Sequence, residues 1–273
     1  MSKRNRDTEN ESVGNKRVST ALDSLALKPG GEDTALVLVY NKRKYHFDPK
    51  NIIFGTPKKT KNSRKLECSY RLEVRKGHFR EVPLDVQTPA CVTRYGLSSY
   101  PNLTEQLKPG EYRKHSINLD FDDPNHPVLR QFQEWDAVNE KELEKNTQSW
   151  LNSEKYRGEY SYMVVSKSPS TGNIHDPRIR FKVAGYTFDD PEDGKLRVGS
   201  KNVGVFGMPE EDDFGVMKAA PQLTVEDIKR DCCVRLRFRH DAIWIGQRVY
   251  STLRATQVQI VEDPGSSEQF GFV

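Results

Sequence analysis

Motifs that mark common enzyme chemistry are missing from this chain of 273 residues. It has no Walker phosphate loop, no Rossmann glycine motif, and neither the HExxH pattern of zinc proteases nor the GxSxG pattern of serine hydrolases. It also lacks an apolar run long enough to cross a membrane and a signal-peptide core at its charged N-terminus. We therefore expect an intracellular protein that uses no cofactor and does not contact a membrane.

Cysteine is scarce as well, since only Cys68, Cys91, Cys232 and Cys233 occur. None of them belongs to a CxxC pair and no close pair of histidines accompanies them, which argues against a zinc site. The adjacent Cys232 and Cys233 stand at the start of a strand-like run, where one of the two has to face inward. Buried, reduced thiols are the simplest interpretation for a protein inside a cell.

Apolar residues are also few, because they make up only 35% of the chain, although aromatic residues reach 10%. A folded core with polar tails fits both values. From the composition we expect residues 1–33 to form a disordered tail and residues 263–273 a flexible one, which leaves 34–262 for the folded domain. The net charge is only +4, so binding of a polyanion depends on where the cations lie rather than on their sum.

Short strand-like segments dominate the expected domain, and only one helix is clear. After Pro127 an apolar stripe recurs at helical spacing through about Leu143, and a second, shorter helix is expected around Trp150 and Leu151. The stripe consists of Val128, Phe132, Trp135 and Val138. Many short strands without a βαβ rhythm predict a mainly β fold of the α+β kind, a barrel or sandwich with insertions and one or two helices.

The most informative feature is a pair of segments, 178–183 and 234–239, in which apolar and basic residues alternate. Successive side chains of a β-strand point to opposite faces, so the apolar residues face a core and the cations stand on the other face. Like charges gathered on a sheet repel one another unless an anion covers them, and the commonest polyanion is nucleic acid. The cations are Arg178, Arg180, Lys182, Arg235, Arg237 and Arg239.

Two interpretations of these cations stay open at the level of the sequence. In the first, they pair with Asp or Glu on neighbouring strands and form a solvated face. In the second, they follow the phosphates of a single-stranded nucleic acid, and Trp244 and Tyr250 stack on its bases. Because no helix is loaded with Arg, Asn or Gln, base readout in a duplex groove is not expected.

A second basic segment, residues 57–65, is expected to form an exposed loop with five Lys and Arg in the eight residues from Lys58 to Lys65. Lys58, Lys59 and Lys61 are suited to clamp a nucleic-acid backbone. The segment also has the form of a nuclear localisation signal, and an exposed loop needs neither role.

The carboxylates Asp120, Asp122 and Asp123 raise a different hypothesis, a Mg²⁺ site of a nuclease. Asp122 and Asp123 precede Pro124 at the expected start of the helix, where acidic residues favour the helix dipole. We therefore expect no metal and no catalytic residue, and keep the nuclease only as an alternative that Mg²⁺-dependent cleavage would have to support.

Several short motifs follow one another along the chain in a characteristic order. They are Asn51-Ile52-Ile53-Phe54-Gly55, Gln87-Thr88-Pro89, Arg94-Tyr95-Gly96-Leu97-Ser98, Trp135-Asp136, Asn146-Thr147-Gln148-Ser149-Trp150, the segment from Arg178 to Lys182, and Ala242-Ile243-Trp244-Ile245-Gly246. This order resembles the single-stranded DNA-binding proteins of nucleocytoplasmic large DNA viruses, a family related to the short-tailed coliphage type. The resemblance covers about residues 35 to 262.

This resemblance implies an OB-like barrel that binds single-stranded DNA without catalysis, in viral replication, recombination or repair. It also implies an acidic C-terminal tail, ending in an aromatic residue, that contacts replication proteins. Here the tail carries only Glu262, Asp263 and Glu268 and ends in Val273, so it departs from that pattern. The expected location is the host nucleus or the viral replication site, with packaging in the virion and formation of a homo-oligomer left open. The alternative is a structural or virion-associated protein that uses the same fold for protein contacts.

Overall fold

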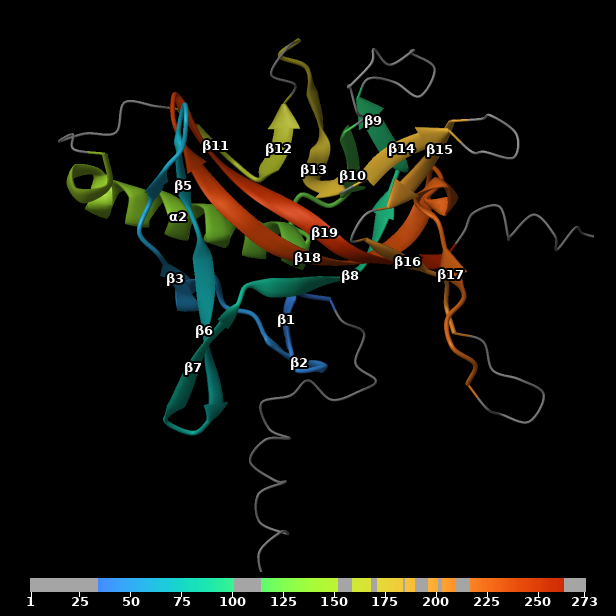
Figure 1. Ribbon diagram of the computed structural model, residues 1–273, viewed down its shortest axis with the longest axis horizontal. Coiled ribbons are helices and arrows are strands. Elements are labelled where there is room, and N and C mark those ends of the chain that lie inside the picture. The colour runs from blue at the N-terminus through green and yellow to red at the C-terminus, as the bar shows by residue number, and fades with distance from the viewer. Residues whose placement is uncertain are drawn as a thin grey trace, which may run out of the picture.

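The computed structural model describes residues 34–100, 114–151, 159–167, 171–183, 185–189, 196–200, 203–209 and 217–262. Both expected tails, 1–33 and 263–273, lie outside these ranges, and the domain boundaries therefore stay predictions. The described residues form nineteen strands, one α-helix and two short 3-10 helices (Figure 1). The expected mainly β fold of the α+β kind is confirmed.

The strands are short at both edges of the main sheet and long in its middle. Their bounds are β1 (Val37–Tyr40), β2 (Arg43–His46), β3 (Ile52–Phe54), β4 (Lys58–Lys59), β5 (Arg64–Leu66), β6 (Cys68–Arg75), β7 (His78–Pro83), β8 (Asp85–Thr93), β9 (Leu97–Tyr100), β10 (Lys114–Asp120), β11 (Glu159–Ser161), β12 (Val164–Lys167), β13 (Ile174–Val183), β14 (Gly185–Asp189), β15 (Leu196–Ser200), β16 (Gly204–Phe206), β17 (Gln222–Leu223), β18 (Cys232–Ile245) and β19 (Arg248–Glu262). The 3-10 helices are η1 (Pro49–Asn51) and η2 (Val225–Asp227).

One large sheet organises the molecule, with the strand order β2-β1-β8-β18-β19-β13-β10-β9. The hairpin β4–β5 adds to β18, β11 and β16 add to β19, and β12 adds to β13. Two smaller sheets, β3-β6-β7 and β14-β15, complete the described part. No pairing among the described residues joins β2 to β9, so hydrogen bonds leave the curved sheet open, which fits an OB-like arrangement because OB barrels are themselves partly open.

The one α-helix of the described residues, α2 (Pro127–Leu151), covers the inner face of the sheet and lies behind β18 and β19 in Figure 1. Its Trp135 stacks near Phe132 and lies 4.9 Å from Phe47 between ring centroids. The prediction of a second helix around Trp150 was wrong, because α2 continues to Leu151 as one helix. The Arg64 guanidinium of β5 donates a hydrogen bond to the Trp150 carbonyl oxygen, and a cation at a helix C-terminus is stabilising.

The start of α2 also differs from expectation. Pro127 is the first helical residue, as its missing N–H favours. His126, rather than Asp122 or Asp123, accepts the hydrogen bond from the Val128 N–H through Nδ1, at 3.3 Å. Asp123 instead accepts from the Asn125 N–H in the turn before the helix.

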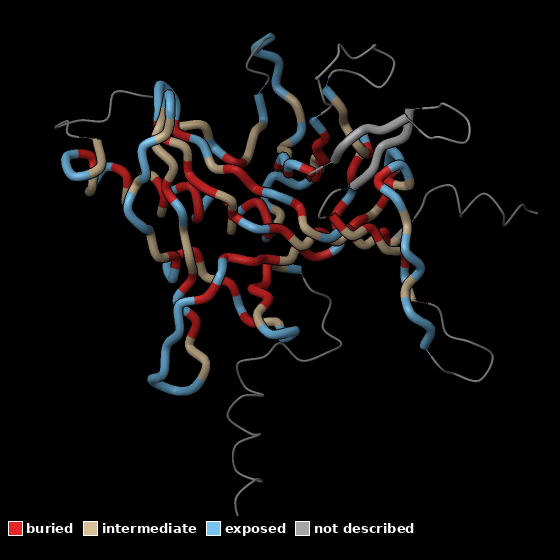
Figure 2. The backbone as a smooth tube through the Cα atoms, in the orientation of Figure 1, coloured by how far each residue is buried: buried red, intermediate tan, exposed pale blue. Residues whose placement is uncertain are grey.

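The core lies between α2 and the inner face of the main sheet, where buried residues line the middle of β8, β18 and β19 (Figure 2). Phe238 of β18 is fully buried and lies 4.9 Å from Phe181 of β13 and 5.9 Å from Phe132 of α2, between ring centroids. Burying one such side chain contributes about 2–3 kcal/mol. These contacts hold β13, β18 and α2 in one rigid unit, so the outer face of the sheet has a fixed shape.

Candidate nucleic-acid interface

Both alternating segments form strands with the orientation that the sequence predicted. In β13 the apolar residues Ile179, Phe181 and Val183 are buried, and Arg180 and Lys182 between them are exposed. In β18 Val234, Leu236 and Phe238 are fully buried, and Arg239 is exposed. The remaining cations, Arg178, Arg235 and Arg237, are half-buried on the outer side.

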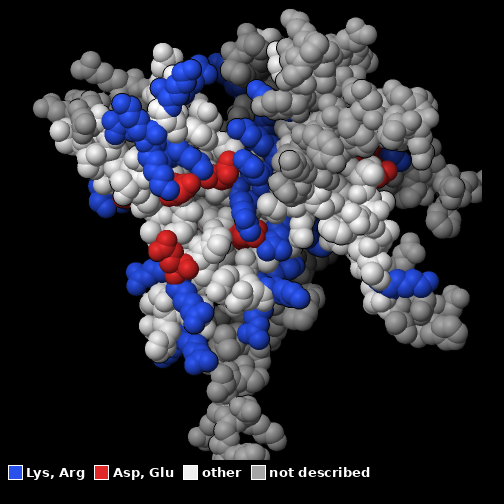
Figure 3. Space-filling view, viewed as in Figure 1, with Lys and Arg blue, Asp and Glu red and all other residues white. Residues whose placement is uncertain are grey.

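Strand order brings the cations of β18 and β13 onto one outer face. β19 lies between these two strands, antiparallel to β18 and parallel to β13. Arg254 of β19 pairs in register with Arg239 on one side and with Lys182 on the other, so three cations form a row across three strands. Residues directly opposite one another in a ladder share a face, and Figure 3 shows Lys and Arg side chains gathered over this part of the sheet.

Arg254 was not among the residues expected from the sequence. A single cation in the stretch 251–261 carries no visible charge pattern. The alternation of apolar and polar residues around it, with Leu253 and Ala255 on either side, is the sequence signal that could have found it.

A β-bulge connects the cationic part of β18 to its aromatic part. The pairing of β18 with β19 shifts register between His240 and Ala242. Before the shift the even-numbered residues up to His240 are buried, and after it Ile243 and Ile245 are buried instead. Trp244 therefore points to the outer face, the same face as Arg239, although strict alternation from residue 234 would have placed it inside.

The aromatic part of the face is a row of four side chains on four neighbouring strands. Trp244 pairs in register with Tyr250 of β19 on one side and with Lys65 of β5 on the other, and Lys65 pairs with Lys58 of β4. Tyr250 is 42% exposed, so its ring is accessible to a base. The predicted aromatic residues Trp244 and Tyr250 thus lie on the cationic face and next to each other.

The expected basic loop is a β-hairpin in the structure. Lys58 and Lys59 form β4, and a turn closed by the Thr60 N–H and the Ser63 carbonyl oxygen leads to β5. Lys61 lies exposed in this turn. Alternation places Lys59 on the face opposite to Lys58, so only one of the two belongs to the row with Trp244.

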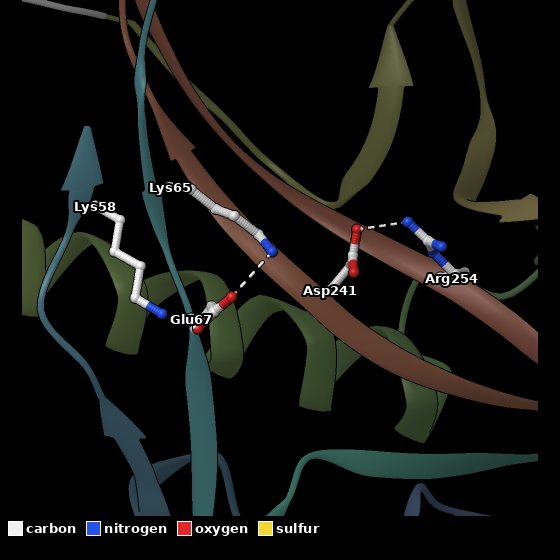
Figure 4. Close-up of polar contacts among 5 residues, drawn as sticks. All are labelled: Lys58, Lys65, Glu67, Asp241 and Arg254. Atoms are coloured by element: carbon white, nitrogen blue, oxygen red, sulfur yellow. Dashed lines mark hydrogen bonds and ion pairs between the residues drawn. The ribbon is translucent and has the colours of Figure 1, made fainter. Parts of the chain in front are cut away.

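Three carboxylates lie on or beside the outer face and neutralise part of its positive charge. Asp85 is buried and accepts two hydrogen bonds from the Arg237 guanidinium, at 2.8 and 3.0 Å. Asp241, the residue at the bulge, forms an ion pair of 2.9 Å with Arg254, as Figure 4 shows. Glu67 accepts from Lys58 at 2.8 Å and from Lys65 at 3.0 Å, and these two ammonium groups lower the pKa of its carboxyl to about 2.

The carboxylates neutralise only some of the cations. Within the described part of the chain, Arg180 has no ion-pair partner, and Lys182 donates only to the Thr252 hydroxyl, at 3.3 Å. Partial burial, and after it the nearby cations Arg254 and Arg180, lower the pKa of the Lys182 ammonium. The first interpretation therefore holds for the cations that are paired within the sheet, and the others form an excess of positive charge.

The carboxylates Asp120 and Asp122 have partners that suit a structural role. Asp120, at the end of β10, accepts from the Arg94 N–H at 3.2 Å, and its burial raises the pKa of its carboxyl. Asp122 forms an ion pair with the Arg94 guanidinium, which also holds Asp176 at 2.8 Å. In the described ranges, no group of three His, Cys, Asp or Glu side chains is placed to hold a metal ion. Nor does any helix in those ranges have the length and apolarity to span a bilayer.

Comparison with solved structures gives distant likenesses. One is gp2.5, a single-stranded DNA-binding protein encoded by bacteriophage T7, with 12% identity and a TM-score of 0.36 over 70% of this chain and 99% of that chain. Another is the single-stranded DNA-binding protein from bacteriophage Enc34, with 13% identity and a TM-score of 0.31 over 77% and 90% of the two chains. That protein has also been solved in complex with single-stranded DNA, at 13% identity and a TM-score of 0.31 over 76% and 95%.

No protein family matches the chain by sequence, and no curated protein matches it either. At such low identity and TM-score, the function has to be argued from the geometry of the outer face itself.

Proposed function

We propose that this protein binds single-stranded DNA without catalysis and with little regard to sequence. The observation that carries the proposal is the continuous outer face of β18, β19 and β13, where a row of cations adjoins Trp244 and Tyr250. Cations attract the phosphates of any sequence, and aromatic rings stack on any base, so their combination suits an unpaired strand. The one α-helix of the described part packs against the inner face of the sheet, where it has no access to a duplex groove.

The biological setting follows from the motif order that this chain shares with the proteins of large DNA viruses. On that basis the protein acts in viral DNA replication, recombination or repair, at the viral replication site or in the host nucleus. Contacts with replication proteins through the C-terminal tail and assembly into a homo-oligomer belong to the same proposal. The motif resemblance supports these points, and the geometry of the face supports DNA binding alone.

The decisive experiment is a salt titration of the affinity for fluorescent oligo-dT, compared with a duplex of the same length. We expect tight binding to oligo-dT at low salt, weaker binding to the duplex, and an affinity that falls steeply as salt rises. A salt-independent affinity, or equal affinity for both DNAs, would contradict the proposal. Salt-insensitive behaviour together with a stable homo-oligomer would favour the alternative, a structural or virion-associated protein.

A charge-matched pair of variants locates the binding to the outer face. Substituting Arg180→Gln and Arg239→Gln removes two exposed cations. The log–log salt slope, that of the logarithm of the binding constant against the logarithm of the salt concentration, loses about 0.7 for each phosphate contact removed on a single strand. We therefore expect the slope to fall by about 1.4. The control carries Lys141→Gln and Lys145→Gln on exposed positions of α2, which removes the same charge and should leave the slope unchanged.

A further inference from the structure

A second site of similar chemistry lies away from the outer face of β18. The β1–β2 hairpin and the β6–β7 hairpin enclose a groove of about 680 Å³ between them. Its lining includes the rings of Tyr40, Tyr45 and Phe79 and the guanidinium groups of Arg43, Arg75 and Arg80. None of the residues that line it is an Asp or a Glu.

The positive charge of this groove is not neutralised by carboxylates. On the outer face, Asp85, Asp241 and Glu67 each form ion pairs with cations. In the described part of the chain, by contrast, no ion pair involves the three groove arginines, all of which are exposed. Three guanidinium groups that share one hollow repel one another, and an anion in the groove relieves that repulsion.

The aromatic rings of the groove differ in how they are held. Tyr45 is buried, so its ring forms part of the floor, whereas Phe79 is 49% exposed on the wall. The Arg71 guanidinium lies 4.2 Å from the centroid of the Phe79 ring and supports it as a cation–π partner. A large apolar ring kept at the surface between arginines suits stacking on a nucleic-acid base better than it suits a purely polar ligand.

Only a few residues of the chain connect the groove to the outer face. β7 carries Arg80 and leads through Leu84 into β8, whose first residue is Asp85, the partner of Arg237. Four residues lie between Arg80 and Asp85, so their Cα atoms are five steps and at most about 18 Å apart. That span corresponds to roughly five or six nucleotides stacked as in a duplex strand. In Figure 3 Lys and Arg side chains are visible over the central strands and over the two hairpins below them.

We propose that the groove between the β1–β2 and β6–β7 hairpins is a second contact for the same single strand of DNA, which extends from the outer face of β18. This rests on the proposed function. Arg43, Arg75 and Arg80 bind phosphates there, and Phe79 stacks on a base. An acidic protein segment would fit the charge but would make no use of the exposed ring, so DNA is the occupant that the groove favours.

The experiment compares three variants of the full chain with oligo-dT of about 20 nucleotides, a length above the site size of one OB fold. The groove variant carries Arg43→Gln, Arg75→Gln and Arg80→Gln. Its log–log salt slope should fall by about 2, from three lost phosphate contacts. The charge-matched control, Arg130→Gln, Lys141→Gln and Lys145→Gln on α2, should match the wild type.

The third variant, Phe79→Ala, tests stacking and should lower the affinity about tenfold without a change of slope. A groove variant that binds oligo-dT like the control overturns the second contact, while the loss seen for Arg180→Gln with Arg239→Gln still supports the outer face. A wild type without salt-dependent binding overturns the proposed function itself. The substituted arginines are exposed, and an unchanged thermal transition shows that the variants are folded.

Discussion

At the scale of single residues, Asp85 stabilises the fold and at the same time reduces the positive charge that the outer face offers to DNA. It is buried, and it neutralises Arg237 directly and Arg239 at 3.8 Å. For Asp85→Asn we expect the free energy of unfolding, measured with urea, to fall by about 1–3 kcal/mol. The Arg237 guanidinium loses a charged partner but is one-third exposed, which limits the loss.

The same substitution should strengthen DNA binding, because Arg237 becomes available to phosphates. The log–log salt slope for oligo-dT should steepen by up to about 0.7. Glu134→Gln, on an exposed position of α2, removes the same charge far from the face and serves as the control. Tighter binding by both variants would indicate an effect of net charge, and would contradict the role of Asp85.

His240 links the stability of the core to pH. Burial lowers the pKa of its imidazole to about 4, against a weaker opposing effect of Asp241, and the ordinary value is 6.5. Above pH 6.5 the folded and unfolded states are both neutral at this residue. Between pH 6.5 and 4 only the unfolded state takes up the proton, so His240 costs about 3 kcal/mol of stability as the pH falls through this window.

Chemical unfolding at several pH values measures this effect. The wild type should lose more stability between pH 6.5 and 4.5 than His240→Gln does, and the difference between the two proteins cancels the other titrating groups. Parallel pH profiles for the two proteins would show that His240 is protonated equally in both states.

At the scale of elements, the turn between β8 and β9 depends on Gly96. Its φ is +60°, and an added Cβ would lie 2.6 Å from the Ile228 carbonyl oxygen and 2.7 Å from Lys229 backbone atoms. Gly96→Ala should therefore destabilise the protein by about 2–3 kcal/mol. Gly77, with φ +76° and open space around it, is the matched control, and Gly77→Ala should cost about 1 kcal/mol. Equal losses of denaturation midpoint would contradict the clash at Gly96.

The elements also show how far the sequence predicts this fold. The strands around Phe181 and Phe238 were predictable, because period-two alternation is a local property that burial reinforces. The hairpin of β4 and β5 was not, since Lys58 to Lys65 offers no apolar alternation and gains its order by pairing with β18. The true end of α2 was missed because a long polar stretch separates Leu143 from Trp150, whose carbonyl oxygen is held by the distant Arg64.

The candidate site was predictable in composition but not in arrangement. The alternating pattern identified the six cations of β13 and β18, and the structure places all six on the outer side. That both strands flank β19, and that Arg254 joins them, depends on pairing between residues far apart in the chain. The partners Asp85 and Asp241 were equally hidden, since a lone Asp has no signature in a single sequence.

At the scale of the whole molecule, a net charge of +4 means that the field of the protein is weak and that binding depends on the local excess of cations. DNA that binds only the folded state should also protect it against heat. At an oligo-dT concentration about 100 times the dissociation constant, the free energy of unfolding should rise by about 2.7 kcal/mol. For a protein of this size that corresponds to a rise in Tm of about 5–10 °C.

Thermal unfolding followed by circular dichroism, with and without oligo-dT, measures this protection. It should disappear near 1 M salt, where charges are screened within about 3 Å. A Tm that oligo-dT raises equally at low and high salt would contradict binding through phosphates.

The bulge near Asp241 has a consequence for how this protein can change over evolutionary time. Upstream of it the outward side chains of β18 are odd-numbered, and downstream the outward Trp244 is even-numbered. Closing the bulge without removing a residue would turn the indole towards the core and Ile243 towards solvent, whereas loss of the extra residue itself would restore a regular ladder with Trp244 still on the outer face. Amino-acid exchanges that keep the bulge leave the face intact, and the bulge can absorb the loss of one residue but not the gain of one. We therefore expect the spacing between Arg239 and Trp244 to tolerate substitution, or the loss of one residue, far better than an insertion.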